Sequence, residues 1–233
     1  MHLFFAENIQ IKDNTFLLTE QEAHHCNVLR INKNEIIGIT DGSGVLIKAK
    51  LINRDKNHCL FKILDIIKNY HKRKYFLHIA IAPTKNIDRF EFFVEKAVEL
   101  GIDRITPLYT ARTERKRVKI ERLEKIAIAA MKQSKNTFKP QIDPLTEFKN
   151  FVNSQQLPEN KFIALCQSTK TLFEQINTNT NNFLVIIGPE GGFTDEEIKF
   201  SLSKNITPIR LSSNTLRTET AGIFVASNFI LKF

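Results

Sequence analysis

The chain has 233 residues, 42% of them hydrophobic and 25% charged, a balance typical of a globular protein and not of a disordered one. Lys and Arg outnumber Asp and Glu by 34 to 25, and the resulting net charge of +9 favours a polyanionic partner such as nucleic acid. Three widely spaced cysteines support neither a zinc cluster nor a disulfide framework, and no apolar run is long enough to span a membrane. We therefore expect a cytoplasmic protein with reduced thiols.

The first 72 residues predict a small β-rich domain. The apolar run 36–40 leads into an Asp-Gly-Ser-Gly turn, and residues 45–51 then alternate apolar with polar. An Asp-Gly pair between two such runs is a strong signal for a β-hairpin. A further apolar run, 58–67, follows a polar turn. We expect residues 1–72 to form a barrel-like module.

The rest of the chain alternates predicted strands with predicted helices. A basic, apolar-poor stretch at 68–74 marks the boundary, so the second domain is placed at 73–233. Residues 86–100 predict a helix, because apolar residues recur at steps of three and four and Gly101 follows where a helix would end. Strands are predicted at 75–82, 104–109, 161–166, 183–187 and 206–211. This alternation favours an α/β domain with a mainly parallel sheet.

A strongly basic region follows the second of these strands. Between positions 110 and 135 the chain has nine basic residues and three acidic ones. A solvated helix face with internal ion pairs, such as Glu121 with Lys125, explains part of this charge. The cluster at 112–117 precedes the predicted helix, and contact with phosphate groups explains it better.

The segment 186–197 combines a buried strand, a glycine-rich turn and a helix start. Thr194 and Glu197 have the spacing of a capping box. A phosphate-binding loop is disfavoured, because Pro189 lacks a backbone donor and Glu190 would repel a phosphate. The glycines would instead let the main chain approach a flat or polar ligand closely. A tight strand-to-helix turn without a ligand explains the segment equally well.

A second polar segment, 211–222, follows the last predicted strand and precedes an apolar helix predicted at 223–231. It contains Arg217 and Glu219 among several hydroxyl-bearing side chains, and alone it could be a solvated helix cap. In open parallel sheets, however, ligands bind outside the carboxyl ends of the strands. Two polar turns at such ends therefore indicate one ligand site.

Taken together, the chain resembles the 16S rRNA (uracil-N3)-methyltransferase family of the SPOUT class. The resemblance rests on Ile-Gly-Pro-Glu-Gly-Gly-Phe-Thr (187–194) and Leu-Arg-Thr-Glu-Thr-Ala (216–221). Further support comes from Glu-Lys-Ala-Val-Glu-Leu-Gly (95–101), Ala-Ala-Met-Lys-Gln-Ser (129–134) and Val-Leu-Arg (28–30). It implies a PUA-like β-barrel RNA-binding domain over 1–72 and a SPOUT methyltransferase domain with a C-terminal trefoil knot over 73–233. It also implies S-adenosylmethionine as cofactor, a homodimer, 16S rRNA or the small ribosomal subunit as partner, and no metal.

The resemblance further implies that three loops hold the cofactor. The residues expected there are Leu165, Cys166, Gln167, Ile187, Gly188, Pro189, Glu190, Gly191, Gly192, Leu211, Ser212, Leu216, Thr218, Glu219, Thr220 and Ala221. We expect Arg217 to stabilise the negative charge that develops on uracil as N3 loses its proton. The alternative role for Arg217 is an ion pair with Glu190 or Glu219. These two carboxylates are also the candidates for a general base, with Glu190 taken as the second catalytic residue.

RNA contacts are expected from basic residues in both domains, namely Arg30, Arg73, Lys85, Arg89, Arg112, Arg115, Lys132 and Lys135. The pair His24-His25 lacks partners at metal-ligand spacing, so we expect an ordinary surface role for it. Two other functions stay open. One is a non-catalytic RNA-binding protein of the same fold, and the other is a SPOUT methyltransferase that acts on tRNA or on a ribose 2′-hydroxyl.

Overall fold

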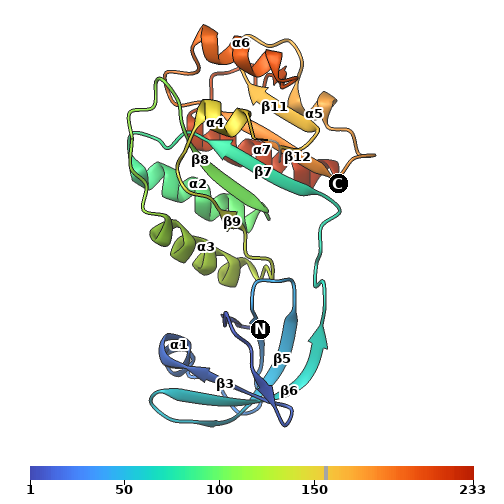
Figure 1. The fold of residues 1–233 in the computed structure, drawn as a ribbon. Coiled ribbons are helices and arrows are strands. Elements are labelled where there is room, and N and C mark those ends of the chain that lie inside the picture. Colours follow the sequence, from blue (N-terminus) through green and yellow to red (C-terminus); the bar gives the residue numbers. More distant parts are fainter. Residues whose placement is uncertain (155–156) are drawn as a thin grey trace. The chain divides into compact units, whose positions relative to one another are not determined.

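The computed structural model describes residues 1–154 and 157–233, and for Glu20 only the main chain (Figure 1). The chain forms two compact units. The first consists of Met1–Lys72 with Ile128–Lys139, and the second of Arg73–Ala127 with Pro140–Phe233. Part of the basic region that was assigned to the second domain therefore groups with the first unit. Within the described residues, no helix combines the length and apolar character needed to cross a bilayer.

The first unit contains a six-stranded sheet with the strand order β1-β4-β5-β6-β3-β2. Its strands are β1 (Leu3–Phe5), β2 (Ile11–Lys12), β3 (Thr15–Thr19), β4 (Ile36–Thr40), β5 (Leu46–Arg54) and β6 (His58–Ile67). Neighbouring strands run antiparallel, except that β1 and β4 are parallel. β1 and β2 are the edge strands of this sheet, and within the described part of the chain they do not pair with each other.

The hairpin predicted in this unit is confirmed, because β4 and β5 pair antiparallel with Ile39 opposite Ile47. Gly42 and Gly44, in the connecting turn, have φ angles of 83° and 92°, which favour glycine. The helix α1 (Glu20–Val28) was not predicted. Its apolar face is hard to recognise in the sequence, because only two of its described side chains, the small Ala23 and Cys26, are buried.

The second unit contains a mainly parallel sheet with the strand order β10-β8-β7-β12-β11-β13, and β9 also pairs with β8. Its strands are β7 (Phe76–Ile81), β8 (Arg104–Tyr109), β9 (Gln141–Ile142), β10 (Thr146–Glu147), β11 (Asn160–Ala164), β12 (Asn182–Ile187) and β13 (Thr207–Ile209). Every pairing recorded among them is parallel. The predicted parallel sheet is therefore confirmed.

Helices cover both faces of this sheet (Figure 1). They are α2 (Ile87–Glu99), α4 (Phe148–Val152), α5 (Leu172–Gln175), α6 (Asp195–Ser203) and α7 (Thr218–Lys232), while α3 (Ile120–Ser134) is divided between the two units. On β12, Phe183 contacts Phe229 of α7, whereas Leu184 packs in a cluster with Phe148 of α4. Burial on both sides explains why β12 has a continuous apolar sequence rather than an alternating one.

The predicted helix at 86–100 is confirmed as α2. The Asn86 side chain accepts a hydrogen bond from the Asp88 N–H at the helix start, and Gly101 follows the helix end with φ of 83°. The helix packs closely on α7 because residue 222 is glycine. A Cβ atom at Gly222 would lie 2.4 Å from the ring of Phe93.

The last helix begins earlier than predicted. We expected its start at residue 223, but α7 begins at Thr218, so residues 218–222, of which the first three are polar, belong to the helix and not to the preceding loop. Hydroxyl-bearing and acidic residues are common at helix starts, because they suit the unpaired N–H groups and the positive end of the helix dipole. A helix cap was one reading of this segment from the sequence, but the helix itself was predicted only from where the apolar residues begin.

A buried polar network crosses the sheet beside β7. Thr106 donates its hydroxyl proton to Asp143, and its oxygen accepts a hydrogen bond from Nε2 of His78 over 2.7 Å. Asp143 also accepts a bond of 2.7 Å from Nε of Arg104. Burial, reinforced by the charge of Arg104, lowers the pKa of His78 from 6.5 to about 4. Burial alone would raise the pKa of Asp143, but the hydrogen bonds from Arg104 and Thr106 outweigh it, and the net shift is downward.

This network predicts a loss of stability in mild acid. Between pH 6.5 and pH 4 the unfolded chain binds a proton at His78 that the folded chain does not, so stability present above pH 6.5 is lost as the pH falls. We expect His78 to lower the free energy of unfolding by about 2 kcal/mol between pH 7 and pH 5. Denaturant unfolding at both pH values should show that this free energy falls less in His78→Gln than in the unaltered protein. The exposed His24→Gln serves as control, and an equal loss in His78→Gln would contradict the assignment.

Candidate functional site

Three neighbouring strands, β12, β11 and β13, run parallel and therefore end at the same edge of the sheet. Hydrogen bonds tie the chain after β11 to β13. The Leu165 N–H donates to the carbonyl of Ile209 over 2.8 Å, and Oγ of Ser168 donates to the carbonyl of Pro208 over 3.0 Å. The two polar turns that the sequence analysis placed at strand ends are thus brought together, with the loop after β11 beside them.

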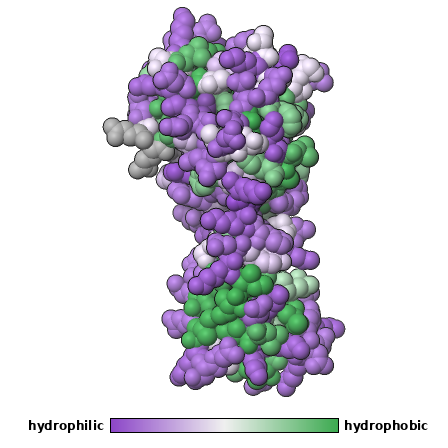
Figure 2. Space-filling view, turned by 90° about the vertical axis from the view of Figure 1, so that its right-hand side faces the viewer, coloured by the Kyte–Doolittle hydropathy of each residue, from purple (hydrophilic) through white to green (hydrophobic). Residues whose placement is uncertain are grey.

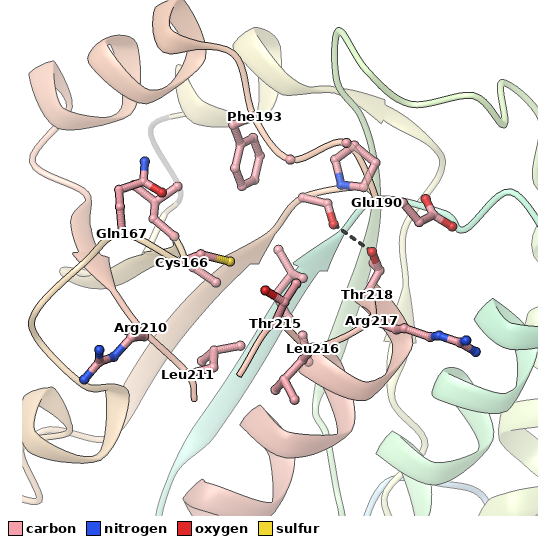
Figure 3. Close-up of a pocket in the computed structure, with 18 of the residues that line it drawn as sticks. Cys166, Gln167, Glu190, Phe193, Arg210, Leu211, Thr215, Leu216, Arg217 and Thr218 are labelled. Carbon is pink, nitrogen blue, oxygen red and sulfur yellow. Dashed lines mark hydrogen bonds between the residues drawn. The ribbon is translucent and has the colours of Figure 1, made fainter. Parts of the chain in front are cut away.

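The three loops line a pocket with a volume of about 540 Å³ (Figure 3). The residues predicted to hold a cofactor that line it are Leu165, Cys166, Gln167, Ile187, Gly188, Pro189, Glu190, Gly191, Gly192, Leu211, Ser212, Leu216, Thr218 and Ala221. Phe193, Asn214 and Thr215, which lie within the predicted turns 187–194 and 211–221, line it too, and the lining residues that were not predicted are Ala164, Asp195, Ile198 and Arg210. Asp195 follows the capping-box threonine, so its place beside the glycine-rich turn was the only available signal.

Two predicted residues, Glu219 and Thr220, do not line the pocket. The reason is the early start of α7. On a helix, residues three apart share a face, so Thr218 and Ala221 face the pocket together while the two residues between them point elsewhere. Glu219 is buried with 8% of its surface exposed, and Thr220 is exposed. Of the two carboxylates considered as general base, Glu190 lines the pocket and Glu219 does not.

The glycine-rich turn after β12 is closed by a hydrogen bond of 2.8 Å from the Gly192 N–H to the carbonyl of Pro189. Gly192 has φ of 68°, a conformation that favours glycine. Gly188 is favoured by packing, because a Cβ atom there would lie 3.0 Å from the ring of Phe193 and the ring would have to shift by a few tenths of an ångström. Backbone conformation and packing thus favour these two glycines independently of a ligand.

The turn is held at both ends. On one side, Oγ1 of Thr218 donates to the carbonyl of Gly188 over 3.2 Å, which joins the start of α7 to the turn (Figure 3). On the other side, the predicted capping box at the start of α6 is confirmed. The Thr194 N–H donates to the Glu197 carboxylate over 2.9 Å, and the Glu197 N–H donates to Oγ1 of Thr194 over 3.2 Å.

Glu190 and Arg217 lie at one side of the pocket. In Figure 3 both side chains extend to the same side, away from Cys166 and Gln167. Both are exposed, and one carboxylate oxygen of Glu190 accepts the Lys85 N–H over 3.1 Å. Within residues 1–154 and 157–233, Arg217 makes no ion pair with Glu190, Glu219 or any other carboxylate. The expected alternative role for Arg217, pairing with one of these two carboxylates, is therefore not seen.

Two basic residues expected to contact RNA bind main-chain carbonyls beside the pocket. Nη1 of Arg112, which also lines the pocket, donates to the carbonyls of Gly191 over 2.7 Å and Phe193 over 3.3 Å. Arg115 donates from Nε to the carbonyl of Thr84 over 3.1 Å and from Nη2 to that of Lys85 over 2.7 Å. The guanidinium groups of Arg112 and Arg115, which we expected to contact RNA phosphates, therefore bond carbonyls of the protein itself.

The other basic residues fall into two groups. Arg73 pairs with Asp103 over 2.7 Å and Lys132 pairs with Glu22 over 2.6 Å, while Lys85 forms an exposed pair with Glu114 over 3.0 Å. The second group is exposed and has no ion pair in the described part of the chain; it consists of Arg30, Arg89 and Lys135. Among the described residues, no three His, Cys, Asp or Glu side chains form a group that could hold a metal ion.

The chain matches two protein-family models and several named relatives. A family model described as RNA methyltransferase domain matches residues 71–230, and one described as RNA methyltransferase PUA domain matches residues 18–64. A protein of Mesomycoplasma hyopneumoniae named Ribosomal RNA small subunit methyltransferase E is 31% identical over 99% of both chains. The protein of that name in Aquifex aeolicus is 27% identical, over 97% of this chain and 98% of its own.

Solved structures show the same similarity. The Neisseria gonorrhoeae protein named Ribosomal RNA small subunit methyltransferase E, bound to S-adenosyl methionine, superposes with a TM-score of 0.90 at 26% identity, over 99% of this chain and 97% of that one. A Legionella pneumophila protein with bound SAM gives a TM-score of 0.85 at 26% identity, over 97% and 95%. These likenesses confirm the predicted fold class, a SPOUT-type α/β domain preceded by a PUA-like domain.

Proposed function

The chain belongs to the RNA methyltransferase family, and from this premise we propose that it transfers the methyl group of S-adenosylmethionine to N3 of a uridine in 16S rRNA. The observation that carries this proposal is the single pocket into which the chain brings all three predicted strand-end loops. Relatives named for the small ribosomal subunit RNA support the choice of substrate, and relatives with bound S-adenosylmethionine support the choice of cofactor.

The residues of the pocket suit this cofactor. A volume of about 540 Å³ lies within the range usual for small-molecule sites. Buried Leu165, Ile187 and Phe193 supply apolar wall for a flat ring, while the turn 188–192 brings main-chain polar groups to the same wall. When bound, S-adenosylmethionine supplies an electrophilic methyl group. The task of the protein is then to align a nucleophile with that group and to exclude water.

Arg217 and Glu190 are the side chains that we assign to the chemistry of the base. Uracil N3 carries a proton that must leave, and its loss places negative charge on the ring. Arg217 lines the pocket, and no carboxylate in the described residues neutralises its charge, so it can stabilise the charge that develops on the base. Glu190 is the carboxylate placed near it at the pocket wall, and we propose it as the proton acceptor in preference to Glu219.

The first domain also has features that suit RNA binding. Lys50 of β5 lies directly opposite Lys62 of β6, an arrangement of like charges that is unfavourable unless an anion offsets it. The same two strands also expose the aliphatic side chains of Ile52, Leu64 and Ile66, and Figure 2 shows hydrophobic residues gathered on a face of this unit. Aliphatic side chains carry no charge and do not stack on bases, so the lysines are the feature that favours RNA. We propose that this domain, over residues 1–72, binds the rRNA, and that the protein acts in the cytoplasm, where that substrate is found.

Methyl transfer in vitro tests the proposal. Purified protein is incubated with isotope-labelled S-adenosylmethionine and with 16S rRNA or small subunits from cells that lack the gene for this protein. We expect label in 3-methyluridine when the 16S rRNA is digested and its nucleosides are separated by mass spectrometry. Label in tRNA or in a 2′-O-methylated nucleoside would replace the substrate assignment. If no label is transferred and calorimetry detects no binding of S-adenosylmethionine, the alternative of a non-catalytic RNA-binding protein replaces the proposal.

Substitution of Arg217 tests its role separately. We expect Arg217→Ala to lower kcat by about 100-fold or more while leaving the affinity for S-adenosylmethionine nearly unchanged, because removing one donor that stabilises developing charge has an effect of that order. Arg217→Lys keeps the charge and should retain part of the activity. Single-turnover kinetics and calorimetry provide the two readouts, and an equal loss of both in Arg217→Ala would make the residue structural.

We also propose that the protein is a homodimer. Phe92 of α2 and Phe224, Ile230 and Leu231 of α7 are exposed in the single chain, and Leu231 is 79% exposed. Exposed apolar side chains on packed helices are typical of a surface that another protein covers. Light scattering during gel filtration should give twice the chain mass of 26.9 kDa. Leu231→Lys should weaken the dimer and the exposed Leu202→Lys on α6 should not; a monomeric mass for the unaltered protein would refute the proposal.

A further inference from the structure

The segment 110–115, between β8 and α3, contacts the glycine-rich turn, which lines the pocket, and also the loop after β7. The first four residues of the segment form a tight turn. The Thr113 N–H donates to the carbonyl of Thr110 over 3.1 Å, and the Thr110 N–H donates to Oγ1 of Thr113 over 3.0 Å. Both threonines are buried, with 2% and 4% of their surface exposed. The backbone that carries Arg112 therefore has a defined, hydrogen-bonded conformation.

A buried carboxylate anchors this turn to the start of α6. Glu197 is 5% exposed, and its two oxygens accept different main-chain groups. One accepts the Ala111 N–H over 2.8 Å, and the other accepts the Thr194 N–H over 2.9 Å. Because Thr194 ends the glycine-rich turn, Glu197 holds residue 111 at a constant place relative to that turn.

From this anchored position, Arg112 reaches the glycine-rich turn. Its Nη1 group bonds the carbonyls of Gly191 and Phe193, the two residues on either side of Gly192. The side chain also packs along the turn, because a Cβ atom at Gly191 would lie 3.4 Å from both Cβ and Cδ of Arg112. Gly192 itself has nothing within 4 Å of the place its Cβ would occupy. Arg112 is thus the side chain that restrains the outer half of the turn.

Arg115 restrains a second loop in the same way. It bonds the carbonyls of Thr84 and Lys85, in the loop that follows β7. The Lys85 N–H in turn donates to the carboxylate of Glu190 over 3.1 Å. The segment therefore holds the glycine-rich turn from two sides, through Arg112 directly and through Arg115 by way of Lys85.

We propose that Arg112 is a positioning residue for the methyl donor, supported by Arg115, and that neither is chiefly a phosphate ligand. The inference rests on the proposed function. A guanidinium has a rigid set of donors that can bond neighbouring carbonyls, whereas a lysine ammonium is a point charge. A phosphate contact needs mainly the charge, but restraint of the turn needs the shape of the guanidinium. The two roles can therefore be separated by substitution.

The experiment uses the full chain with Arg112→Ala, Arg112→Lys and, for contrast, Arg117→Ala. Arg117 lies two residues beyond the segment, is exposed, and has no hydrogen bond or ion pair in the described residues. We expect Arg112→Ala to raise the calorimetric Kd and the KM for S-adenosylmethionine by about tenfold, with kcat and the KM for RNA nearly unchanged. Arg112→Lys should raise the same Kd several-fold although the charge is kept. Arg117→Ala should leave that Kd unchanged and lower only RNA affinity and its salt dependence.

The outcomes distinguish this inference from the function on which it rests. If Arg112→Ala binds S-adenosylmethionine as tightly as the unaltered protein and loses RNA affinity instead, Arg112 is a phosphate ligand and the inference is overturned. Full retention of cofactor affinity in Arg112→Lys would also overturn it, because charge alone would then suffice. If the unaltered protein binds no S-adenosylmethionine, the proposed function itself fails and this inference fails with it. Thermal unfolding of each variant identifies any general loss of folding.

Discussion

Parallel pairing of β11 with β12 on one side and with β13 on the other is the constraint on which the site depends. It forces three loops, separated by up to about fifty positions in the chain, to leave the sheet at one edge. The bond from Leu165, the first residue after β11, to Ile209, the last residue of β13, ties the start of one loop to the end of the neighbouring strand. The pocket is therefore a direct consequence of strand order, and its walls are main chain as much as side chain.

The strand ends can serve as a fixed frame because both faces of the sheet are buried. Alternate residues of β12 contact α7 and the cluster around α4, so a shift of register by one residue would exchange the two sets of contacts. The close approach of α7 at Gly222 and its bond from Thr218 to Gly188 connect that packing to the pocket. The geometry of the binding turn thus depends on contacts that are themselves part of the core.

The sequence predicted the strands that lead into the pocket and the two polar turns well, because a buried parallel strand and a capping box each leave a local pattern. The shorter strands β1, β2, β3, β9 and β10 were not predicted. The start of α7 was misplaced because its first three residues, 218–220, are polar, and α1 was missed because its buried face is only Ala23 and Cys26. The surroundings of Arg112 could not be predicted at all. Its carbonyl partners lie 79 and 81 positions away, and the pattern of charges along the chain does not identify them. From the sequence alone, the basic cluster at 112–117 suggests phosphate binding. Only the fold shows that Arg112 bonds carbonyls of the protein.

The central claim is that the loops after β11, β12 and β13 together form the binding site for the methyl donor. A crystal structure of the protein grown with saturating S-adenosylhomocysteine, the demethylated form of that donor, tests it most directly. The account predicts electron density for the ligand inside the pocket, in contact with residues 165–167, 187–192 and 211–218. Density for the ligand at another place, with this pocket empty, would contradict the account.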